Sequence, residues 1–402
     1  MTITREEAEE LDAADPLARL RTEFDLPEGV IYLDGNSLGP PPRQALARLE
    51  DTASKEWRQG LIRSWNDAGW FDLPKRAGAK IAQLIGAAPS DVIIADSVSV
   101  NLFKVAAALI ARKRAPIIAI EANEFPTDAY ILEGLAGLTG ARLTRIAAGA
   151  PIPAGLDVLV KSLVHYRTGA VADLRAVEKQ ATVKGASVIW DLSHAVGLLD
   201  INLTRDGARY AVGCGYKFLN GGPGAPAFVY VAEKAANVHS QPLSGWMGHV
   251  APFDFAPDYR PARGVARFAA GTPPILSLAA LDAALDLFEG VNLADVEAKA
   301  RALGDLFLKC CAPLGLETIS PPVGARRGAQ ASFIHENGFE IMQALIARGV
   351  IGDFRAPNIM RFGFSPLFLS YVQVFDAATA LADVVRNETW RAPEYSRRGA
   401  VT

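Results

Sequence analysis

Cysteine is scarce in this sequence, with three residues, Cys214, Cys310 and Cys311, among 402. Three thiols cannot build the disulfide framework of a small secreted protein, and no cysteines and histidines occur at zinc-binding spacing. The sequence therefore excludes a disulfide-stapled scaffold and a zinc module, and no metal site is expected. A reducing compartment, the cytoplasm, suits this composition.

Long apolar runs and a charge excess of one sign are also missing. The formal net charge is -3, from 41 Lys and Arg against 44 Asp and Glu, and so small an excess exerts little long-range attraction on nucleic acid or an anionic membrane. No apolar stretch approaches the roughly 20 residues that a membrane-spanning helix needs. The first twenty residues are acidic and lack the apolar segment of a signal peptide. We therefore expect a soluble protein with no nucleic-acid or membrane partner.

What the sequence does have is an alternation of short apolar runs with helical stretches. Half of its residues are hydrophobic, and 402 residues suit two domains better than one small core. The runs 158–163 and 187–190 predict strands that are buried on both faces, while 100–111 and 173–184 have helical patterns. This order predicts an α/β fold with a mostly parallel sheet.

The pattern changes after residue 290. Strand-like runs at 331–335 and 359–364 flank a helical pattern at 339–348, which predicts a smaller α+β unit. We expect this small domain to include the N-terminal segment as well. The predicted parts are an N-terminal segment (1–50), a large α/β domain (51–290) and a small C-terminal domain (291–402).

An acid and a lysine stand at places where chemistry is expected. Asp191 ends the apolar strand VIWD, and ligands of open parallel sheets bind at the carboxyl ends of strands. A helix cap or a structural ion pair explains this acid equally well when it is taken alone. Lys217 follows 26 residues later, just before the glycine-rich stretch NGGPG, where the backbone can approach a ligand closely. A solvated surface lysine is the plain alternative.

The pairing of the two residues points to pyridoxal 5'-phosphate. That cofactor requires a lysine for its aldehyde carbon and an acid for its pyridinium nitrogen. Its phosphate also needs a site, and Asp96 to Ser99 follow an apolar run and open a helical stretch, where free N–H groups and the helix dipole favour an anion. A simple N-cap is the competing explanation of that segment. No Walker loop or dinucleotide fingerprint is present elsewhere.

Eight segments spread over the chain carry a resemblance to one family. They are YLDGNSLGP (32–40), DSVSVNLFK (96–104), NEFPTD (123–128), WDLSHAVG (190–197), GYKFLNGGPG (215–224), SGWMGH (244–249), GTPP (271–274) and RAPNIMRFGFSPLF (355–368). Together they resemble the kynureninase family, within the aspartate-aminotransferase-like (fold type I) enzymes. The resemblance implies a large PLP-dependent transferase-like domain. It also implies hydrolytic cleavage of the β,γ carbon–carbon bond of L-kynurenine to anthranilate and L-alanine, in tryptophan catabolism.

The resemblance also assigns roles around the cofactor. Lys217 would hold the aldehyde as a Schiff base, and Asp191 would face the pyridinium nitrogen. Tyr216 would assist at the phosphate, and we expect its phenol, acidified beside phosphate and lysine, to transfer a proton during hydration or cleavage. The other cofactor-binding residues implied are Val98, Ser99, Phe125, Pro126, Thr127, Asp128 and His194.

Further matches concern a second subunit and the substrate carboxylate. Trp246 and Thr272 match residues that in this family reach the phosphate from the neighbouring subunit, which implies a homodimer with shared active sites. Arg361 matches the arginine that grips the α-carboxylate of the substrate, a task that suits a bidentate guanidinium. The plain alternatives are a core residue for Trp246, as for Phe125, and a structural ion pair for Arg361.

Substrate choice is read from the remaining matches. Trp65 together with Gly271 and Thr272 resembles the bacterial form of the pocket, which is associated with L-kynurenine, and 3-hydroxykynurenine is expected to be a poorer substrate. Asn36, in the first motif, is also assigned to the substrate.

Three rival functions fit the same kind of chain. A cysteine desulfurase or selenocysteine lyase shares the fold but needs a mobile nucleophilic cysteine. Cys310 and Cys311 lie in a helical pattern and Cys214 in a strand, so none looks suitable. A class V aminotransferase would depend on a 2-oxo acid. A protein that binds the cofactor without turnover would release no anthranilate.

Overall fold

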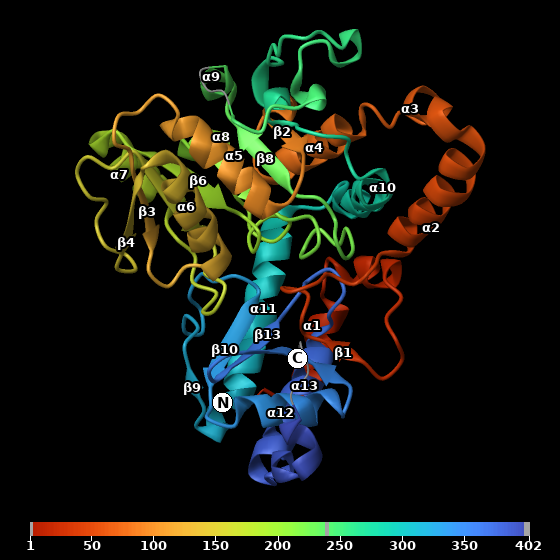
Figure 1. Ribbon diagram of the computed structural model, residues 1–402. Helices are drawn as coiled ribbons and strands as arrows, with labels where there is room; N and C mark the ends of the chain where they lie inside the picture. The colour runs from red at the N-terminus through yellow and green to blue at the C-terminus, as the bar shows by residue number, and fades with distance from the viewer. Residues whose placement is uncertain (1–2, 238–240, 398–402) are drawn as a thin grey trace.

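A seven-stranded, mostly parallel sheet forms the centre of the upper part of the molecule (Figure 1). The computed structural model describes residues 3–237 and 241–397. The strand order is β2-β8-β7-β6-β5-β3-β4, in which β8 runs antiparallel to β2 and β7 and the other pairs are parallel. The strands are β2 (Val92–Ile94), β3 (Ile117–Glu121), β4 (Arg142–Ile146), β5 (Val158–Ser162), β6 (Ser187–Asp191), β7 (Tyr210–Gly213) and β8 (Phe228–Val231). The predicted fold class is confirmed.

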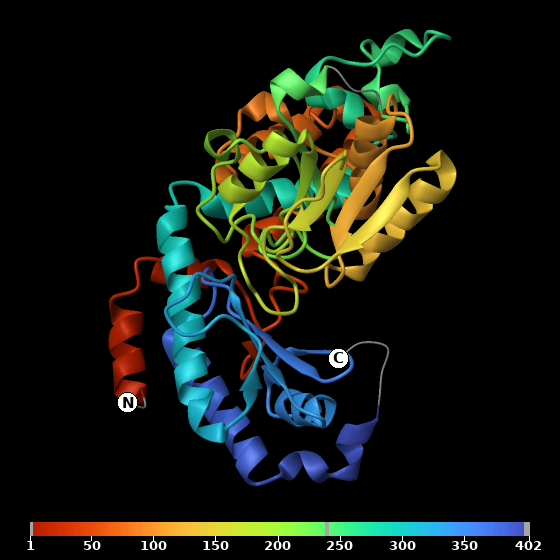
Figure 2. The same cartoon turned by 90° about the vertical axis from the view of Figure 1, so that its left-hand side faces the viewer.

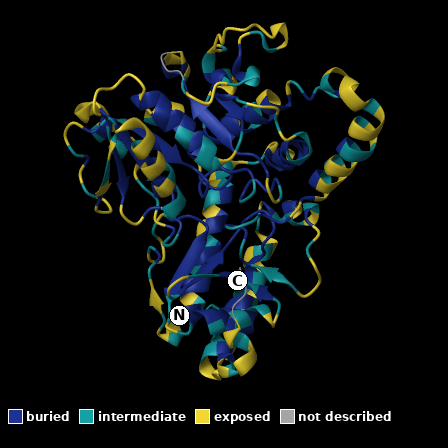
Figure 3. Ribbon diagram, in the orientation of Figure 1, coloured by how far each residue is buried: buried dark blue, intermediate teal, exposed yellow. Residues whose placement is uncertain are grey.

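Helices cover both faces of this sheet and enclose two separate hydrophobic cores. Successive side chains of a strand point to opposite faces, so β6 sends Ile189 into the core beneath α5 and α6, and Val188 and Trp190 into the other core. Figure 3 shows the central strands buried between the helices. The helices of this part are α2 (Arg43–Asp51), α3 (Ser64–Asp67), α4 (Leu73–Leu84), α5 (Val98–Ile110), α6 (Pro126–Thr139), α7 (Leu174–Lys184), α8 (Leu203–Asp206), α9 (Glu233–Ala236) and α10 (Ile275–Ala284). A π-helix, Thr52–Gly60, continues α2.

A second, antiparallel sheet lies in the lower part of the molecule, in the order β12-β13-β10-β9. The long helix α11 (Leu293–Cys311) runs down to it from the upper part (Figure 1). The other elements here are β9 (Glu317–Thr318), β10 (Gln330–Ile334), β11 (Val350–Ile351), β12 (Asp353–Arg355), β13 (Ile359–Gly363), α12 (Gly338–Ile346) and α13 (Tyr371–Arg386). This part has the α+β composition that the sequence predicts for residues beyond 290.

The N-terminal segment joins these C-terminal elements. α1 (Arg5–Ala13) packs on α13, and β1 (Ile31–Tyr32) pairs in parallel with β11. Figure 2 shows α1 beside the C-terminal elements rather than the large sheet. α2, which spans the predicted boundary at residue 50, packs against α10 of the upper part. The domain boundaries at residues 50 and 290 stay predictions.

Local sequence signals set several helix ends. Thr4 and Glu7 form a capping box at α1, in which the Thr4 hydroxyl accepts from the Glu7 N–H at 3.2 Å. Ser97 caps α5 by accepting from the Val100 N–H at 3.4 Å. Gly185 ends α7 in the left-handed conformation, with φ 73°, which glycine adopts without steric cost.

Two kinds of feature are absent from the described parts of the chain. None of their helices is both long and apolar enough to cross a membrane. Nor do residues 3–237 and 241–397 contain a group of three or more His, Cys, Asp or Glu side chains placed to hold a metal ion.

A buried ion pair ties the N-terminal segment to α11. Lys299 Nζ lies 2.8 Å from a carboxylate oxygen of Asp15, and both side chains are buried. Replacement Asp15→Asn leaves the ammonium uncompensated, so we expect the free energy of unfolding to fall by about 3–5 kcal/mol. Asp51→Asn, which breaks an exposed pair with Lys55, is the control and should change stability far less. Urea denaturation measures both, and equal effects would contradict the expected importance of the buried pair.

Candidate active site

A cavity of about 290 Å³ opens at the carboxyl ends of the parallel strands. Asp191 is the last residue of β6 and Ser162 the last of β5, and both line it. Tyr216 and Lys217 enter from the segment after β7, and Asp128 from the first turn of α6. Segments far apart in the chain meet here because parallel strands end at the same edge of the sheet.

The Lys217 amine points at His194. Its Nζ lies 2.9 Å from His194 Nε2. Burial, and then the charge of Lys217, holds the pKa of His194 well below its usual range. A neutral imidazole that accepts at Nε2 carries its proton on Nδ1. That Nδ1 is buried and has no hydrogen-bond partner within the described chain.

Two carboxyl groups face the same cavity, from Asp191 and Asp128. Asp191 Oδ1 accepts a hydrogen bond from the Ser193 N–H at 2.8 Å, which orients it. Burial, then the charges of Asp191 and Glu124, raises the pKa of Asp128 well above its usual range, and Lys217 opposes this. Carboxyl groups this close do not ionise together readily. Burial and this repulsion therefore both favour the protonated form of Asp128.

The N-terminus of α5 forms another wall. Val98 and Ser99 line the cavity and supply the first N–H groups of the helix, which have no partner within a helix. The N-cap explanation holds for Ser97, whose hydroxyl is used by the Val100 N–H. It does not use the N–H groups of Val98 and Ser99, so the segment combines a cap with a potential anion site.

The FPTD motif covers a further side of the cavity. Phe125 is 39% exposed, and its ring stands nearly perpendicular to that of Tyr166, with centroids 5.3 Å apart. Pro126 begins α6, a position that suits a residue without an N–H. This start places Thr127 and Asp128 in the first turn, where both line the cavity.

Tyr216 lines the cavity next to the lysine. Lys217 Nζ lies 5.9 Å from the centre of its ring. Burial, followed by Cys214 and Asp191, raises the pKa of the Tyr216 phenol. This direction is opposite to the acidified phenol that the sequence led us to expect, because burial, Cys214 and Asp191 all raise the pKa. Proton transfer by Tyr216 stays a prediction.

Arg361 lies behind the cavity rather than on its wall. It is 2% exposed, and its Nε and Nη2 pair with the Asp353 carboxylate at 2.9 and 2.5 Å. Its Nη1 donates to the carbonyl oxygen of Tyr166 at 2.8 Å, and Tyr166 lines the cavity. Within one chain these contacts are those of a structural ion pair, and one residue separates the guanidinium from the cavity. Substrate binding by Arg361 stays a prediction.

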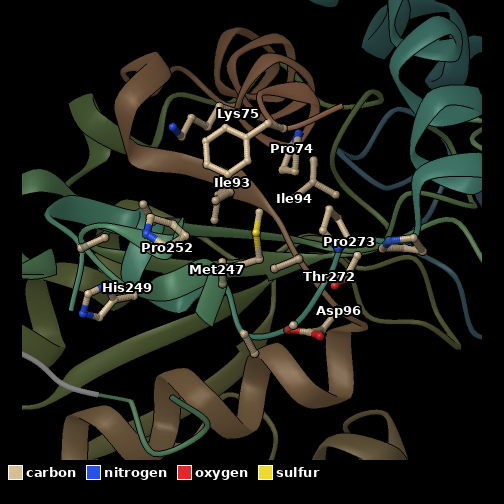
Figure 4. A pocket seen from close by; sticks show the side chains of 18 of the residues that line it. Pro74, Lys75, Ile93, Ile94, Asp96, Met247, His249, Pro252, Thr272 and Pro273 are labelled. Atoms are coloured by element: carbon tan, nitrogen blue, oxygen red, sulfur yellow. The ribbon is translucent and has the colours of Figure 1, made fainter. Parts of the chain in front are cut away.

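The residues expected to act from a neighbouring subunit lie elsewhere. Gly271 and Thr272 line a separate, mainly apolar cavity of about 210 Å³. Figure 4 shows Thr272 and Met247 on its wall. Trp246 packs edge-on against Phe253, with ring centroids 5.7 Å apart. Within one chain, none of Trp246, Gly271 and Thr272 is among the described residues that line the Lys217 cavity.

Two predicted substrate residues also lie outside that cavity. Trp65 packs edge-on against Trp70, with centroids 6.0 Å apart. Asn36 is fully buried, and a Cβ on Gly363 would come within 2.0 Å of its Oδ1, so the two residues are tightly packed. Neither amide atom of Asn36 has a hydrogen-bond partner in the described regions of the chain. The roles of both residues stay predictions.

Six residues that line the cavity were missed as site residues, namely Ser162, Tyr166, Ser193, Cys214, Ala225 and Ala227. Ser162 ends β5 just as Asp191 ends β6, so applying the strand-end rule to every strand would have found it. Tyr166 lies in a loop whose path depends on tertiary contacts, and no sequence signal singles it out.

The residues present fit pyridoxal phosphate. Lys217 supplies an amine, Asp191 and Asp128 supply the acids, and Val98 and Ser99 supply N–H groups at a helix start. An exposed aromatic ring completes the set, and the volume approaches the roughly 300 Å³ at which small-molecule pockets begin. These groups match the aldehyde, ring nitrogen, phosphate and ring face of the cofactor.

Gly39 holds the Leu33–Pro40 loop against the lysine segment. Its N–H donates to the Tyr216 carbonyl oxygen at 2.7 Å, and an added Cβ would lie 2.2 Å from the Lys217 carbonyl oxygen. Replacement Gly39→Ala must displace that segment, so we expect a loss of about 1–3 kcal/mol in unfolding free energy and weaker cofactor binding by absorbance titration. Gly134→Ala in α6, where a Cβ meets nothing within 4 Å, should stabilise the helix by up to about 1 kcal/mol. Unchanged cofactor affinity in Gly39→Ala would contradict this role.

Known kynureninases match almost the whole chain. The kynureninase of Burkholderia mallei (strain SAVP1) is 48% identical over 414 residues, covering 99% of this chain and 100% of that protein. The kynureninase of Pseudomonas fluorescens is 45% identical with the same coverage. The family model described as the kynureninase C-terminal domain matches residues 296–381.

Solved structures share the fold at low identity. The apo cysteine desulfurase of Thermococcus onnurineus NA1 has a TM-score of 0.79 and 20% identity, over 96% of this chain and 100% of that chain. A C-DES mutant with glycine covalently linked to the PLP cofactor has a TM-score of 0.81 and 17% identity, over 90% and 99%. At such identities the likeness establishes the fold and leaves the reaction open.

The relatives and the cavity agree on one family. Full-length identity of 45–48% joins the chain to proteins named kynureninase, and the cavity holds the groups that pyridoxal phosphate requires. The chain belongs to the kynureninase family of pyridoxal-phosphate-dependent hydrolases that act on carbon–carbon bonds.

Proposed function

We propose that this protein hydrolyses the bond between the β- and γ-carbons of L-kynurenine and releases anthranilate and L-alanine, with 3-hydroxykynurenine as a poorer substrate. The observation that carries the proposal is the cavity in which the Lys217 amine meets an acid pair and a helix N-terminus. Full-length similarity to kynureninases supports it. A cytoplasmic location and a role in tryptophan catabolism belong to the same proposal, and the three unpaired cysteines of the described chain suit the former.

The residues of the cavity are assigned to parts of the cofactor. Pyridoxal phosphate, when bound, supplies an aldehyde for the amine and an electron-poor ring that withdraws electrons from the substrate α-carbon. Lys217 would bind the aldehyde carbon, and Asp191 would hold the proton on the ring nitrogen. The N–H groups of Val98 and Ser99 bind the phosphate. Phe125 covers a face of the ring.

Proton movements are assigned to Lys217 and Tyr216. The Lys217 amine removes the α-proton of the substrate, and His194, 2.9 Å away, orients that amine. Water adds to the γ-carbonyl carbon, and Tyr216 gives its proton to the carbonyl oxygen. The raised pKa of Tyr216 suits this role, because the phenol keeps its proton until negative charge develops on that oxygen. The β,γ bond then breaks, and anthranilate leaves with the oxygen of the added water. The protons of the hydrated carbonyl restore the Tyr216 phenol and convert the β-carbon to a methyl group, with the third released to solvent. Lys217 returns the α-proton, which completes L-alanine.

The substrate is held at two places in this proposal. Arg361 binds the α-carboxylate, which requires it to share its N–H groups between that carboxylate and Asp353. Trp65 and Gly271 border the aromatic ring of the substrate and favour the unsubstituted form, and Asn36 supports this side.

A homodimer with shared active sites completes the proposal. Trp246 and Thr272 lie outside the Lys217 cavity of their own chain, among exposed apolar side chains that include Phe253 and Phe255. Exposed apolar groups of this kind mark surfaces that bind other chains. We infer that these residues reach the phosphate of the neighbouring subunit.

Lysine replacement tests the catalytic assignment. Lys217→Ala should lower the release of fluorescent anthranilate from L-kynurenine by at least about 10³-fold, because both the covalent attachment and the base are lost. It should also change the visible absorbance of the bound cofactor. Lys179→Ala, an exposed residue of α7, is the control and should keep both. Repeated turnover by Lys217→Ala would reject the assignment.

The same assay separates the rival functions. L-Kynurenine should be cleaved faster than 3-hydroxykynurenine. Sulfide release from L-cysteine would support a desulfurase instead, and burial, which raises the pKa of the Cys214 thiol in the cavity, argues against that reaction. Dependence on a 2-oxo acid would support an aminotransferase.

Mixing two inactive variants tests the shared site. Lys217→Ala and Trp246→Ala homodimers should each be weakly active, the first without its amine and the second without the ring from its partner. After subunit exchange, a mixed dimer has one site with both residues intact. Random exchange makes half of the dimers mixed, so activity should recover to about one quarter of that of the unsubstituted enzyme. No recovery, with exchange verified by mass spectrometry, would show that the site is not shared.

A further inference from the structure

A cluster of charged residues lies beside the cavity, where the loop after β1 meets β12 and β13. We call it the arginine–aspartate cluster, and its members are Asp34, Ser37, Asp353, Arg355 and Arg361. Asp353 and Arg361 are buried, with 1% and 2% exposure. Arg361 donates to the carbonyl oxygen of Tyr166, which lines the Lys217 cavity. The cluster is therefore one residue away from the cavity.

Asp353 serves both arginines of the cluster. Its Oδ1 accepts from Arg361 Nε at 2.9 Å, and its Oδ2 lies 2.5 Å from Arg361 Nη2 and 2.6 Å from Arg355 Nη2. The Ser37 hydroxyl donates to Oδ2 at 2.9 Å and accepts from both guanidinium groups at 3.0 and 2.8 Å. One carboxylate thus faces two cations, which leaves one positive charge for another group to balance.

Asp34 is the second acid of the cluster. Its Oδ1 is buried and has no hydrogen-bond partner among residues 3–237 and 241–397. Burial, then the charge of Asp353, raises the pKa of Asp34 to about 7, against the opposing effects of Ser37 and the two arginines. Tyr32 nearby stays neutral, because burial and then Asp34 raise its pKa. The cluster therefore carries one net positive charge below about pH 7 and none above it.

The two arginines also keep hydrogen-bond donors. The Arg355 side chain is 42% exposed, and its ion pair with Asp353 and its hydrogen bond to Ser37 both use Nη2, while its Nε is buried without a partner in the described chain. Arg361 makes four hydrogen bonds, while a guanidinium has five N–H groups. Arg355 can therefore bind a second carboxylate without breaking its contact with Asp353.

We propose that Asp34 sets how tightly the site binds the carboxylate of its amino-acid substrate: the neutral acid leaves the arginine pair a free positive charge, and the ionised acid removes it. This rests on the proposed function, in which Arg361 binds the α-carboxylate, and it adds Arg355 as a second guanidinium. Asp34 is a positioning residue here, because it acts through the arginines.

Carboxylate binding and Asp34 ionisation oppose each other. A bound carboxylate raises the pKa of Asp34, and ionised Asp34 weakens carboxylate binding by the same factor. If each anion shifts the other by about one pKa unit, affinity falls about tenfold as the pH rises through 7. The stability of the fold also decreases as the pH rises. The unfolded acid ionises near its usual 3.8, so the stability that protonated Asp34 contributes is complete below that value and is lost as the pH rises toward 7.

The test compares the holoenzyme with its Asp34→Asn variant, which keeps the shape and removes the charge. Titration calorimetry measures the affinity for L-alanine, the carboxylate-bearing product, at about pH 6 and about pH 8.5. We expect both proteins to bind similarly at the lower pH and the unsubstituted enzyme to bind about tenfold more weakly than the variant at the higher pH. L-Alaninamide, which lacks the carboxylate, should bind with no difference between the two proteins. Comparison at each pH cancels the titration of the ligand amine.

The controls separate this proposal from folding and from the proposed function. Asp51→Asn, on an exposed side chain, should behave as the unsubstituted enzyme does. The melting temperature of Asp34→Asn should equal or exceed that of the unsubstituted enzyme at the higher pH, and a lower value would contradict the buried charge. Equal pH dependence of L-alanine binding with and without Asp34 would overturn the proposal. If L-kynurenine is not cleaved while the Asp34-dependent binding persists, the proposed function fails and this inference stands.

Discussion

The contact between the Lys217 amine and a neutral His194 is the interaction on which the site depends. A charged imidazole would repel the lysine, and an imidazole exposed to water would not hold the amine in one direction. Burial beneath the strand ends keeps His194 neutral, so the amine is held at 2.9 Å with the acids of the cavity around it. The hydrophobic cores on both faces of the sheet fix the strands from which these side chains project.

The Leu33–Pro40 loop connects this amine with the substrate side of the site. At one end Leu33 accepts from the Gly363 N–H at 2.6 Å, next to Arg361 on β13. At the other end Gly39 packs on the lysine segment so closely that no Cβ fits. Asp34 and Ser37 lie between these contacts. One short loop therefore fixes the spacing between the lysine, which follows β7 of the large sheet, and the arginines, which belong to the second sheet.

The sequence predicts the elements of the fold well, and their arrangement less well. The runs at 158–163 and 187–190 become β5 and β6, and the helical patterns become α5 and α7, because buried apolar periodicity decides each locally. The antiparallel direction of β8 depends on tertiary pairing, which no local pattern encodes. β7, only four residues with alanine and glycine among them, is indicated in the sequence only as the short apolar run before Lys217.

The same division holds for the site. Asp191 and Lys217 could be singled out because a strand end and a glycine-rich turn give each a local signal, and the structure brings both to one cavity. The pairing of the Arg361 guanidinium with Asp353 could not be predicted, because Asp353 lies on the neighbouring strand β12 and only the folded sheet brings the two together. The raised pKa of Tyr216 was missed as well, because it comes from burial and from the nearby Cys214 and Asp191, which only the folded structure places around the phenol.

The burial of His194 has a consequence for how the protonation of the site depends on pH. An imidazole beside a reactive amine ordinarily gains or loses a proton around pH 6.5, and the amine then changes with the medium. Here burial lowers the pKa of His194, so the imidazole gains a proton only in much more acidic solution. The imidazole beside the amine thus stays neutral through the neutral pH range, and a change of pH in that range acts on the amine through other groups.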